Sequence, residues 1–430
     1  MGSREERFKP EGYSDYRQPA QVDRDRVQYA SAFARLAEVT QVVSADKGYV
    51  FHNRLTHSLK VAQLARRLAE KLDKEQHDVL RAVGGVNADV AEAAALAHDL
   101  GHPPFGHLAE EALDELCQEY GLPDGFEGNA QSFRIVTKIA VGDPLDPHGI
   151  GIVGLNLTRA TLNGILKYPW CRNGNPAKPK KWGAYESERE IFEWVRAEQP
   201  FGLNVKSIEA ELMDWADDIT FSVHDLVDFY CAGQIPLDQL ASDRGGSEER
   251  EAFFQEVFER NPELQGRRHY LEDAFSEIIE YFPLNRRYIG SREQRCLLWQ
   301  FTTILIARYV EAISIAVAPA VGAPIVEILP DALDEIRMLK ELTWHYVILQ
   351  SELAMNQHGQ KHMVQSVFHE LRSAADDGKL RKLFPPFFRS QIAHASGDKG
   401  TTTRVVSDYI SSMTERELGT LYRSLTGSCG

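Results

Sequence analysis

The chain has 430 residues, of which 43% are hydrophobic and 26% are charged. This balance is that of an ordinary globular protein with a large core, and it excludes disordered, collagen-like and coiled-coil chains. The 63 acidic residues outnumber the 48 Lys and Arg and give a formal net charge of −15, so the chain lacks the global basic field of a dedicated nucleic-acid binder, while a local basic pocket stays compatible with it.

Apolar residues recur with the period of an α-helix along most of the chain, and this pattern predicts an all-α fold. The first clear helix carries leucines four or five residues apart from Leu55 to Leu72. An Ala-rich helix over 91–100 follows, which Gly101 and two prolines stop. Ser207 is the expected N-cap of a long helix. Further helices are predicted over residues 109–120, 295–318, 331–352, 361–375 and 415–425.

Alternating strand patterns are scarce and short. The candidate strands are residues 40–43, 49–51 and 149–154. Three polar stretches are predicted to be loops, namely residues 142–151, 172–183 and 241–250. None of these loops is long or repetitive enough to indicate a domain linker, and no internal repeat is visible. We therefore expect one large helical body.

Cysteine usage and hydropathy favour a cytoplasmic protein without a membrane partner. The five cysteines are scattered and form no CxxC pair, which predicts reduced thiols. The first twenty residues are polar and lack the apolar stretch of a signal peptide. The longest apolar run, residues 312–326, contains two prolines and is shorter than the roughly 20 residues that a bilayer crossing needs.

One of three His-Asp dipeptides stands out by its context. His77-Asp78 lies in a polar run and is expected on a solvated helix face, whereas His98-Asp99 ends an apolar helix. A semi-buried imidazole and carboxylate at that place are costly unless they have partners. Together they suit a divalent metal ion. The alternative is a capping carboxylate beside a core histidine.

Two other helices offer partners for this dipeptide. His57 lies on the apolar stripe of the first helix, where a satisfied core histidine is the simpler interpretation. The long helix carries an acidic stripe beside its apolar stripe, and a solvated face is the simpler interpretation there. Asp217 and Asp218 are about 100° apart on a helix. Only one of them can share a face with Phe221 and Asp225, and we select Asp217.

The pattern His57 … His98-Asp99 … Asp217 resembles that of the HD-domain metal phosphohydrolases. Longer blocks resemble their dGTPase-like branch, the deoxynucleoside triphosphate triphosphohydrolases: VQYASAFARLAEVTQV, NRLTHSLKV, AHDLGHPPFGHLAEEAL, GFEGNAQSFRI, ILKYPW, MDWADDITFSVHDLVD and SDYISSMT. These blocks run from Val27 to Thr414, nearly the whole chain. The combination of HDLGHPPFGH with FEGNAQ is highly specific, whereas HD alone is weak.

The resemblance implies an all-α HD-domain fold as one unit over residues 1–430. Its HD core would cover about 27–230, and a C-terminal helical part over about 250–430 would complete the active site and the oligomer contacts. The implied reaction is metal-dependent hydrolysis of dGTP or several dNTPs to deoxynucleoside and tripolyphosphate. The implied assembly is a homo-oligomer, a hexamer or tetramer, and the apolar segment 312–329 is either a contact surface or part of the chain's own core.

The resemblance also implies roles for individual residues. One divalent ion (Mg, Mn, Co, Ni, Fe or Zn) would be held by His57, His98, Asp99 and Asp217. His107, oriented by Glu110 one helical turn on, would assist catalysis, and His102 would face the α-phosphate; a structural turn histidine and an ordinary first-turn glutamate are the alternatives. The substrate-contacting residues would be Gln41, Arg54, Asn129, Gln131, Lys167, Tyr168, Phe221 and Asp225. Capping of the next helix is the alternative role for Asn129 and Gln131, the two polar residues of FEGNAQ.

Several features limit or extend this hypothesis. Phe221 stands where the family typically has a tyrosine, so a hydroxyl that could hydrogen-bond sugar or phosphate is missing. No GxxxxGK[ST] motif supports kinase or ATPase chemistry.

Two alternatives remain: an HD-fold phosphohydrolase of another nucleotide phosphate ester, and a non-catalytic nucleotide or single-stranded nucleic-acid sensor. An allosteric dNTP or single-stranded DNA site near 178–181 or 381–389 also stays open, although solvated loops explain those basic runs more simply.

Overall fold

The computed structural model describes residues 4–11, 16–41, 53–141, 154–197, 199, 201–242, 246–349, 351–395 and 397–427. Their regular structure consists of helices and one two-stranded antiparallel sheet, so the prediction of an all-α fold is confirmed. Among these residues no helix has the length and apolar character needed to cross a membrane.

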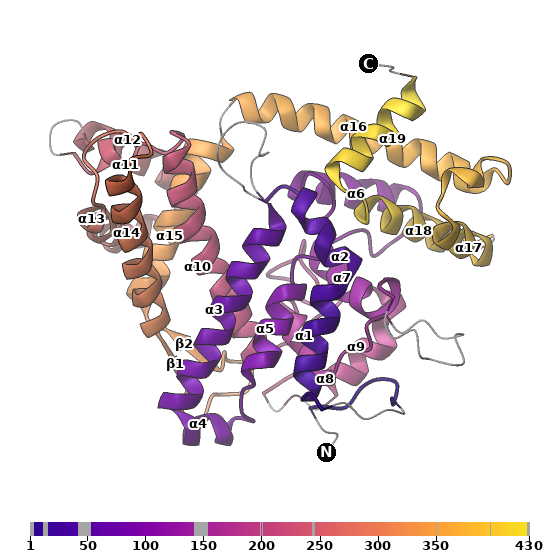
Figure 1. Cartoon of the computed structure of the whole chain (residues 1–430), viewed down its shortest axis with the longest axis horizontal. Helices are drawn as coiled ribbons and strands as arrows, with labels where there is room; N and C mark the ends of the chain where they lie inside the picture. The colour runs from indigo at the N-terminus through magenta and orange to yellow at the C-terminus, as the bar shows by residue number, and fades with distance from the viewer. Residues whose placement is uncertain are drawn as a thin grey trace.

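Three helices form the centre of the molecule (Figure 1). They are α3 (Arg54–Glu75), α5 (Ala88–Ala97) and α10 (Ile208–Cys231), each packed against the other two. Five buried alanines make α5 thin, so its neighbours approach closely. Asn53, Asn87 and Ser207 cap the three helices with their side chains, which satisfies backbone N–H groups at the helix starts.

The leucine stripe of α3 is buried from Val61 to Leu72, in line with His57. Leu59 is exposed instead, because a residue two positions from His57 lies about 200° around the helix. Shorter helices lie around this centre: α1 (Pro19–Tyr29), α2 (Ser31–Arg35), α4 (His77–Ala82), α8 (Arg159–Ile165) and α9 (Arg189–Arg196). The short helix α11 (Leu237–Leu240) packs instead against α12 (Gly246–Arg260).

The C-terminal helices build a second apolar cluster around α6 (His107–Glu119). They are α16 (Ser351–Asp376), α17 (Pro386–His394), α18 (Lys399–Ser411) and α19 (Glu415–Thr426), coloured from orange to yellow in Figure 1. Phe126 and Phe368 are fully buried in this cluster. Since α6 begins with His107, the C-terminal part of the chain supports a helix that carries a candidate site residue.

The remaining large helices extend the central core on its other side (Figure 1). They are α12 (Gly246–Arg260), α13 (Arg268–Tyr281), α14 (Arg292–Glu311) and α15 (Pro330–Thr343). Strands β1 (Ile313–Ile315) and β2 (Val326–Ile328) pair antiparallel, with Ile313 opposite Ile328. The other short elements are α7 (Gly128–Arg134), η1 (Leu36–Glu38), η3 (Ile135–Ile139), η4 (Glu186–Glu188), η5 (Pro262–Arg267), η6 (Trp344–Ile348) and η7 (Leu380–Leu383).

Three predicted elements need correction. The helix predicted over 295–318 ends at Glu311, and its last residues form β1 and a turn in which Ala318 has a positive φ of 56°. The helix predicted over 331–352 changes at Trp344 into the π-helical turn η6. The loop predicted over 241–250 becomes helical at Gly246. The loop 142–151 and the strands 49–51 and, nearly whole, 149–154 lie outside the described residues, while Thr40 forms an isolated bridge to Asn53.

Candidate active site

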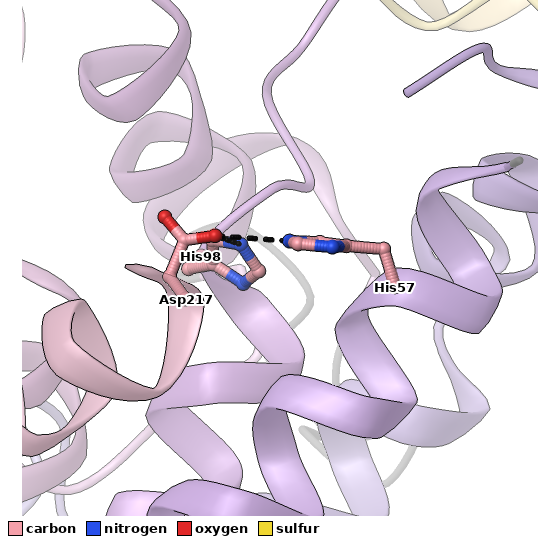
Figure 2. Close-up of side chains that lie close together, drawn as sticks. All are labelled: His57, His98 and Asp217. Carbon is pink, nitrogen blue, oxygen red and sulfur yellow. Dashed lines mark hydrogen bonds and ion pairs between the residues drawn. The ribbon is translucent and has the colours of Figure 1, made fainter. Parts of the chain in front are cut away.

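Side chains from three segments of the central helices converge at one buried point (Figure 2). His57 lies in the first turn of α3, His98 directly follows α5, and Asp217 lies in the middle of α10. His57 Nε2 is 2.9 Å from Asp217 Oδ1, and His98 Nε2 is 3.9 Å from the same oxygen. Their ligand atoms lie within 4.8 Å of one another, a spacing that one metal ion can span.

The protonation of His98 also fits a metal ion. Its Nδ1 lies 2.6 Å from the backbone oxygen of Ala95, and since a carbonyl only accepts, Nδ1 carries the proton. In the neutral ring Nε2 is then the acceptor nitrogen, and although it is buried it finds no hydrogen-bond partner among the described residues. Metal-binding histidines characteristically bond a carbonyl through their other nitrogen in this way. Two imidazoles with carboxylates suit a divalent transition metal.

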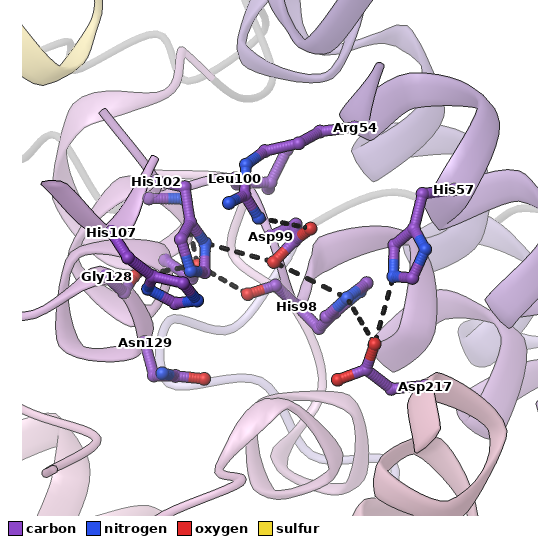
Figure 3. Close-up of polar contacts among 12 residues, drawn as sticks. Arg54, His57, His98, Asp99, Leu100, His102, His107, Gly128, Asn129 and Asp217 are labelled. Atoms are coloured by element: carbon purple, nitrogen blue, oxygen red, sulfur yellow. Dashed lines mark hydrogen bonds and ion pairs between the residues drawn. The ribbon is translucent and has the colours of Figure 1, made fainter. Parts of the chain in front are cut away.

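Asp99 lies between this cluster and a second pair of histidines (Figure 3). Its Oδ2 accepts from Arg54 at 2.8 Å, and its Oδ1 lies 3.0 Å from His102 Nδ1 and 3.5 Å from His98 Nε2. Burial opposes the negative charge of Asp99, but Arg54, His98 and His102 outweigh burial and hold the pKa of its carboxyl well below the usual value. Burial and Arg54 lower the pKa of His102 to about 4, so this ring is neutral at neutral pH.

A tight turn connects His98-Asp99 to α6. Phe105 and Gly106 both have positive φ, 68° and 61°, which is unfavourable for a phenylalanine. Glu415 at the start of α19 accepts the backbone N–H of Phe105 at 3.1 Å. Arg35 donates to the backbone oxygens of Leu100 and His102, each at 2.8 Å. The turn is thus held by side chains distant in sequence.

His107 begins α6 and is paired with Glu110. Its Nδ1 lies 2.8 Å from Glu110 Oε2, and its side chain is 71% exposed while Glu110 is buried. Burial opposes the charge of Glu110, but His107, Lys181 and His102 hold the pKa of its carboxyl well below the usual value. The arrangement leaves Nε2 of His107 available for proton transfer beside a fixed anion.

Comparison with known proteins identifies the family of this chain. Residues 54–141 match the HD domain, and residues 326–424 match a phosphohydrolase-associated domain. Three relatives carry the name deoxyguanosinetriphosphate triphosphohydrolase-like protein. The relative from Streptomyces coelicolor is 36% identical to this chain over 95% of this chain and 92% of its own length. The relative from Corynebacterium efficiens is 35% identical over 97% of this chain and 93% of its own length. The relative from a Shewanella strain is 30% identical over 96% of this chain and 93% of its own length.

The chain belongs to the dGTPase-like family of HD-domain phosphohydrolases. The HD match contains His57, His98 and the turn to His107, whereas Asp217 lies outside both matched segments. An HD domain implies a divalent metal ion, and the donor set around His98 described above can hold one.

A cavity of about 600 Å³ opens over these groups. Its lining includes most of the residues predicted for the HD-domain site: Gln41, Arg54, His98, Asp99, His102, His107, Asn129, Lys167, Tyr168, Asp217 and Phe221. Lys167 Nζ donates to Asp217 Oδ2 at 2.7 Å and contacts Asp214 Oδ1 at 2.8 Å. Burial disfavours its charge, but these two aspartates hold the pKa of Lys167 well above the usual value.

Two predicted substrate residues lie outside the lining of this cavity. The Gln131 amide is buried and donates to Asp408 Oδ1 at 2.9 Å, on the side of α18. Asp225 is buried deeper along α10, where burial and then Asp228 raise the pKa of its carboxyl well above the usual value. The candidate metal ligand His57 and the His107 partner Glu110 are not part of the lining but contact residues that are, Asp217 and His107.

Other lining residues were not assigned to the site from sequence. Lys340, Trp344 and Ile348 follow one another at intervals of four on α15 and η6, and Gln357 comes from α16. An interval of four places these three residues on one helix face, and this spacing is the feature of the sequence from which they could have been grouped. Lys181 also lines the cavity, although its basic run favoured a solvated loop. Lys361 and Arg404, two further cations of the chain, pair with Glu115 and Asp124 away from the cavity.

Proposed function

We propose that this protein hydrolyses deoxynucleoside triphosphates, either dGTP or several dNTPs, to deoxynucleoside and tripolyphosphate. The observation that carries the proposal is a cavity of suitable size that joins a cluster able to hold a metal ion, an exposed His107 paired with a buried Glu110, and three cations placed to meet a triphosphate. These cations are Arg54, Lys167 and Lys340. A triphosphate needs such local positive charge in a chain whose net charge is −15.

His57, His98, Asp99 and Asp217 would hold one divalent ion, drawn from Mg, Mn, Co, Ni, Fe and Zn. A bound ion there supplies Lewis-acid polarisation of a phosphate oxygen. Water then attacks the α-phosphorus and releases a proton to solvent, and the bond from that phosphorus to the 5′-oxygen of the deoxynucleoside breaks. The Arg54 and Lys340 cations neutralise charge on the tripolyphosphate as it forms.

His107 would act as the general acid. Glu110 fixes its Nδ1–H, so Nε2 can give a proton to the departing 5′-oxygen. His102, neutral and with its Nδ1 3.0 Å from Asp99 Oδ1, would face the α-phosphate. Each of these roles is supported by position in the cavity rather than by sequence spacing alone.

The sugar end of the cavity would select deoxyribose. The Gln41 Oε1 is a buried acceptor at the lining and has no hydrogen-bond partner among the described residues. It can accept from a sugar 3′-hydroxyl. In that position Gln41 would also leave no room for a 2′-hydroxyl, and the Phe221 ring, which lines the cavity, would pack against the sugar. Asn129 adds a polar side chain to the lining, and Tyr168 would contact the phosphates beside Lys167.

The proposal includes a cytoplasmic homo-oligomer, a hexamer or tetramer. The scattered cysteines suit a reducing compartment. The apolar segment 312–329 supports an interface in part, because its inner residues are buried in the chain's own core while Val317, Val321 and Leu329 are exposed.

A panel of the four dNTPs and their ribonucleotide counterparts, each with Mg, Mn or Co, tests the reaction. We expect intact tripolyphosphate and deoxynucleoside from one or more dNTPs and little product from ribonucleotides. Release of orthophosphate from a nucleoside monophosphate, with dNTPs left intact, would contradict the proposal. Binding of dNTPs without turnover would contradict it as well.

The His107→Ala variant tests the catalytic assignment within this panel. General acids contribute about 10²–10⁴-fold to rate, so kcat should fall by that range. Metal content and calorimetric dNTP affinity should stay close to those of the wild type, because the metal cluster and the cations are intact. Turnover near the wild-type rate would show that His107 is structural.

A further inference from the structure

A lysine from the loop 172–183 bridges two buried carboxylates behind the candidate catalytic pair. Lys181 Nζ lies 2.8 Å from Glu110 Oε1 and 3.1 Å from Glu127 Oε1. Glu110 and Glu127 are both buried, whereas Lys181 reaches them from the cavity wall and is half-buried. The loop that supplies Lys181 therefore closes one side of the site.

Both carboxylates have a second, fixed set of contacts. Glu127 is the N-cap of α7 and accepts the backbone N–H groups of Asn129 at 2.6 Å and Ala130 at 2.9 Å. Glu110 binds His107 through its other oxygen. The contacts thus form a chain that runs from α7 through Glu127, Lys181 and Glu110 to His107. Only Lys181 in this chain is a permanent cation.

The charges in this chain depend on one another. Burial, and then the charge of Glu110, raises the pKa of Glu127 to about 7, and Lys181 opposes both effects. Burial also disfavours the charge of Lys181, but Glu127 and Glu110 hold the pKa of its ammonium group above the usual value. Other titratable groups that face the cluster are His102 from the turn, His107 from α6, Tyr168 after α8, and Tyr185, whose hydroxyl donates to the backbone oxygen of Glu127 at 3.1 Å.

We propose that Lys181 is a positioning residue for the proposed reaction: it holds Glu110 and Glu127 together and keeps Glu110 placed as the anion that orients His107. The inference rests on the proposed function, and it deepens that function by giving the basic loop a task in the active site. Without the ammonium group, two buried carboxylates face each other unneutralised. They would then share a proton, and the bond from Glu110 to His107 would lose its fixed geometry.

Lys181→Met tests this proposal against Lys180→Met. Lys180 is the neighbouring lysine of the same loop, is 86% exposed and contacts Glu111 at 3.7 Å, so it controls for loss of a loop charge. We expect kcat of Lys181→Met to fall by about 10–100-fold, the range that follows from small misplacement of a reacting group. Its calorimetric dNTP affinity should change less than threefold. Lys181→Arg should recover most of kcat, and Lys180→Met should match the wild type.

The pH dependence separates positioning from a simple phosphate contact. Removal of the cation raises the pKa values of the two carboxyls, so the acidic limb of the kcat profile should move upward by about one pH unit in Lys181→Met. An increase of KM alone, with kcat and the acidic limb unchanged, would overturn the proposal and leave Lys181 as a substrate contact.

Infrared titration of the protonated carboxyl band gives a readout that needs no turnover. The band that Glu127→Gln removes identifies the cluster, and its midpoint should shift upward by about one pH unit in Lys181→Met but not in Lys180→Met. An unshifted midpoint would overturn the proposal. If the wild type hydrolyses no dNTP, the proposed function fails, and this titration still decides whether Lys181 sets the charge of the cluster.

Discussion

Asp217 and Asp218 are neighbours on α10 with different partners, and this difference predicts different effects on metal binding. Asp217 contacts His57, while Asp218 pairs with Lys340 at 2.6 Å. Asp217→Ala should weaken metal affinity by 100-fold or more, because substitution of a residue that only hydrogen-bonds a metal ligand already lowers metal affinity by about 10–100-fold. Asp218→Ala should keep its metal and substantial turnover. Mass spectrometry of metal content checks both variants, and full occupancy in Asp217→Ala would refute the assignment.

At the residue scale, helix geometry decides which way a side chain faces. Periodicity places His57 on the apolar stripe of α3 and favours Asp217 over Asp218 on α10, whereas their role as metal ligands comes from the resemblance to the HD-domain pattern and stays a prediction. Asn129 and Gln131 were both assigned to the substrate. They are two residues apart on α7 and therefore about 200° apart, so Asn129 reaches the cavity and Gln131 faces Asp408 instead.

Distance along α10 explains why Asp225, the second predicted substrate residue, lies outside the cavity lining. Asp225 is eight residues from Asp217, which corresponds to about 12 Å of helix rise. That distance carries it past the cavity, whereas Phe221 stays within the lining. Local patterns place Lys340 on one helix face and Lys181 in a loop, but they do not show that either meets the site, because long-range packing brings α15 and that loop to the cavity.

The turn between α5 and α6 depends on a glycine that packs against α7. A Cβ at Gly101 would lie 2.2 Å from the Gly128 carbonyl oxygen and from the Ser132 backbone nitrogen. Gly101→Ala should therefore destabilise the protein by about 3 kcal/mol, the upper end for overpacking, because backbone atoms cannot yield like a flexible side chain. It should also lower metal affinity, since Ser132 Oγ joins Gly101 to His98 through hydrogen bonds.

Gly359 provides the control for this substitution. It lies exposed within α16, and a Cβ there meets nothing within 4 Å. Gly359→Ala should stabilise the protein by up to about 1 kcal/mol through helix propensity. Chemical denaturation measures both changes. Equal stabilities of the two variants would show that the turn tolerates a Cβ at Gly101.

At the element scale, regular amphipathic helices are predictable and interruptions are not. The helices α3, α5 and α10 carry long stripes and clear caps. The run after Glu311 is apolar enough to extend α14, yet it forms β1 because residues 326–328 supply a pairing partner. Only the tertiary structure reveals that Glu211 of α10 accepts the N–H groups of Ile325 and Val326 and secures this hairpin.

The attachment of the hairpin makes the stability of the whole molecule depend on pH. Burial raises the pKa of Glu211 to about 7 from a usual value near 4.5, against the opposing effect of the two N–H groups. Below pH 4.5 the group is protonated in both states and its favourable contribution is complete. As pH rises above 4.5 the unfolded chain loses the Glu211 proton first, while the folded protein keeps it until about pH 7. The free energy of unfolding therefore falls over this range, and the contribution of the protonated group is lost once pH has passed 7.

Glu211→Gln should therefore reduce the loss of unfolding free energy between pH 5 and pH 8, by about 1–3 kcal/mol relative to the wild type. The glutamine oxygen can still accept from the hairpin. Glu327→Gln, on the exposed side of β2, is the control and should leave the pH dependence unchanged. Denaturant titrations at several pH values measure the difference, and parallel curves for Glu211→Gln and wild type would refute the prediction.

The tip of the same hairpin bears on the assembly of the whole molecule. Val321 is 84% exposed, Val317 is exposed in the same turn, and the exposed Leu203 belongs to the segment that the tip contacts, since Gly322 donates to the Phe201 backbone oxygen at 3.0 Å. Grouped exposed apolar side chains of this kind are typical of interaction surfaces. If the proposed homo-oligomer uses this tip, Val321→Asp should lower the mass seen by light scattering at a given concentration. The unfolding midpoint of the separated subunit should stay close to that of the wild type, because the substituted side chain has no buried contacts to lose.

Val141→Asp is the control for this substitution. It changes a valine that is 83% exposed on another part of the surface, and it should leave the mass unchanged. A monomeric wild type would refute the oligomer, and an unchanged mass for Val321→Asp would show that the subunits meet elsewhere.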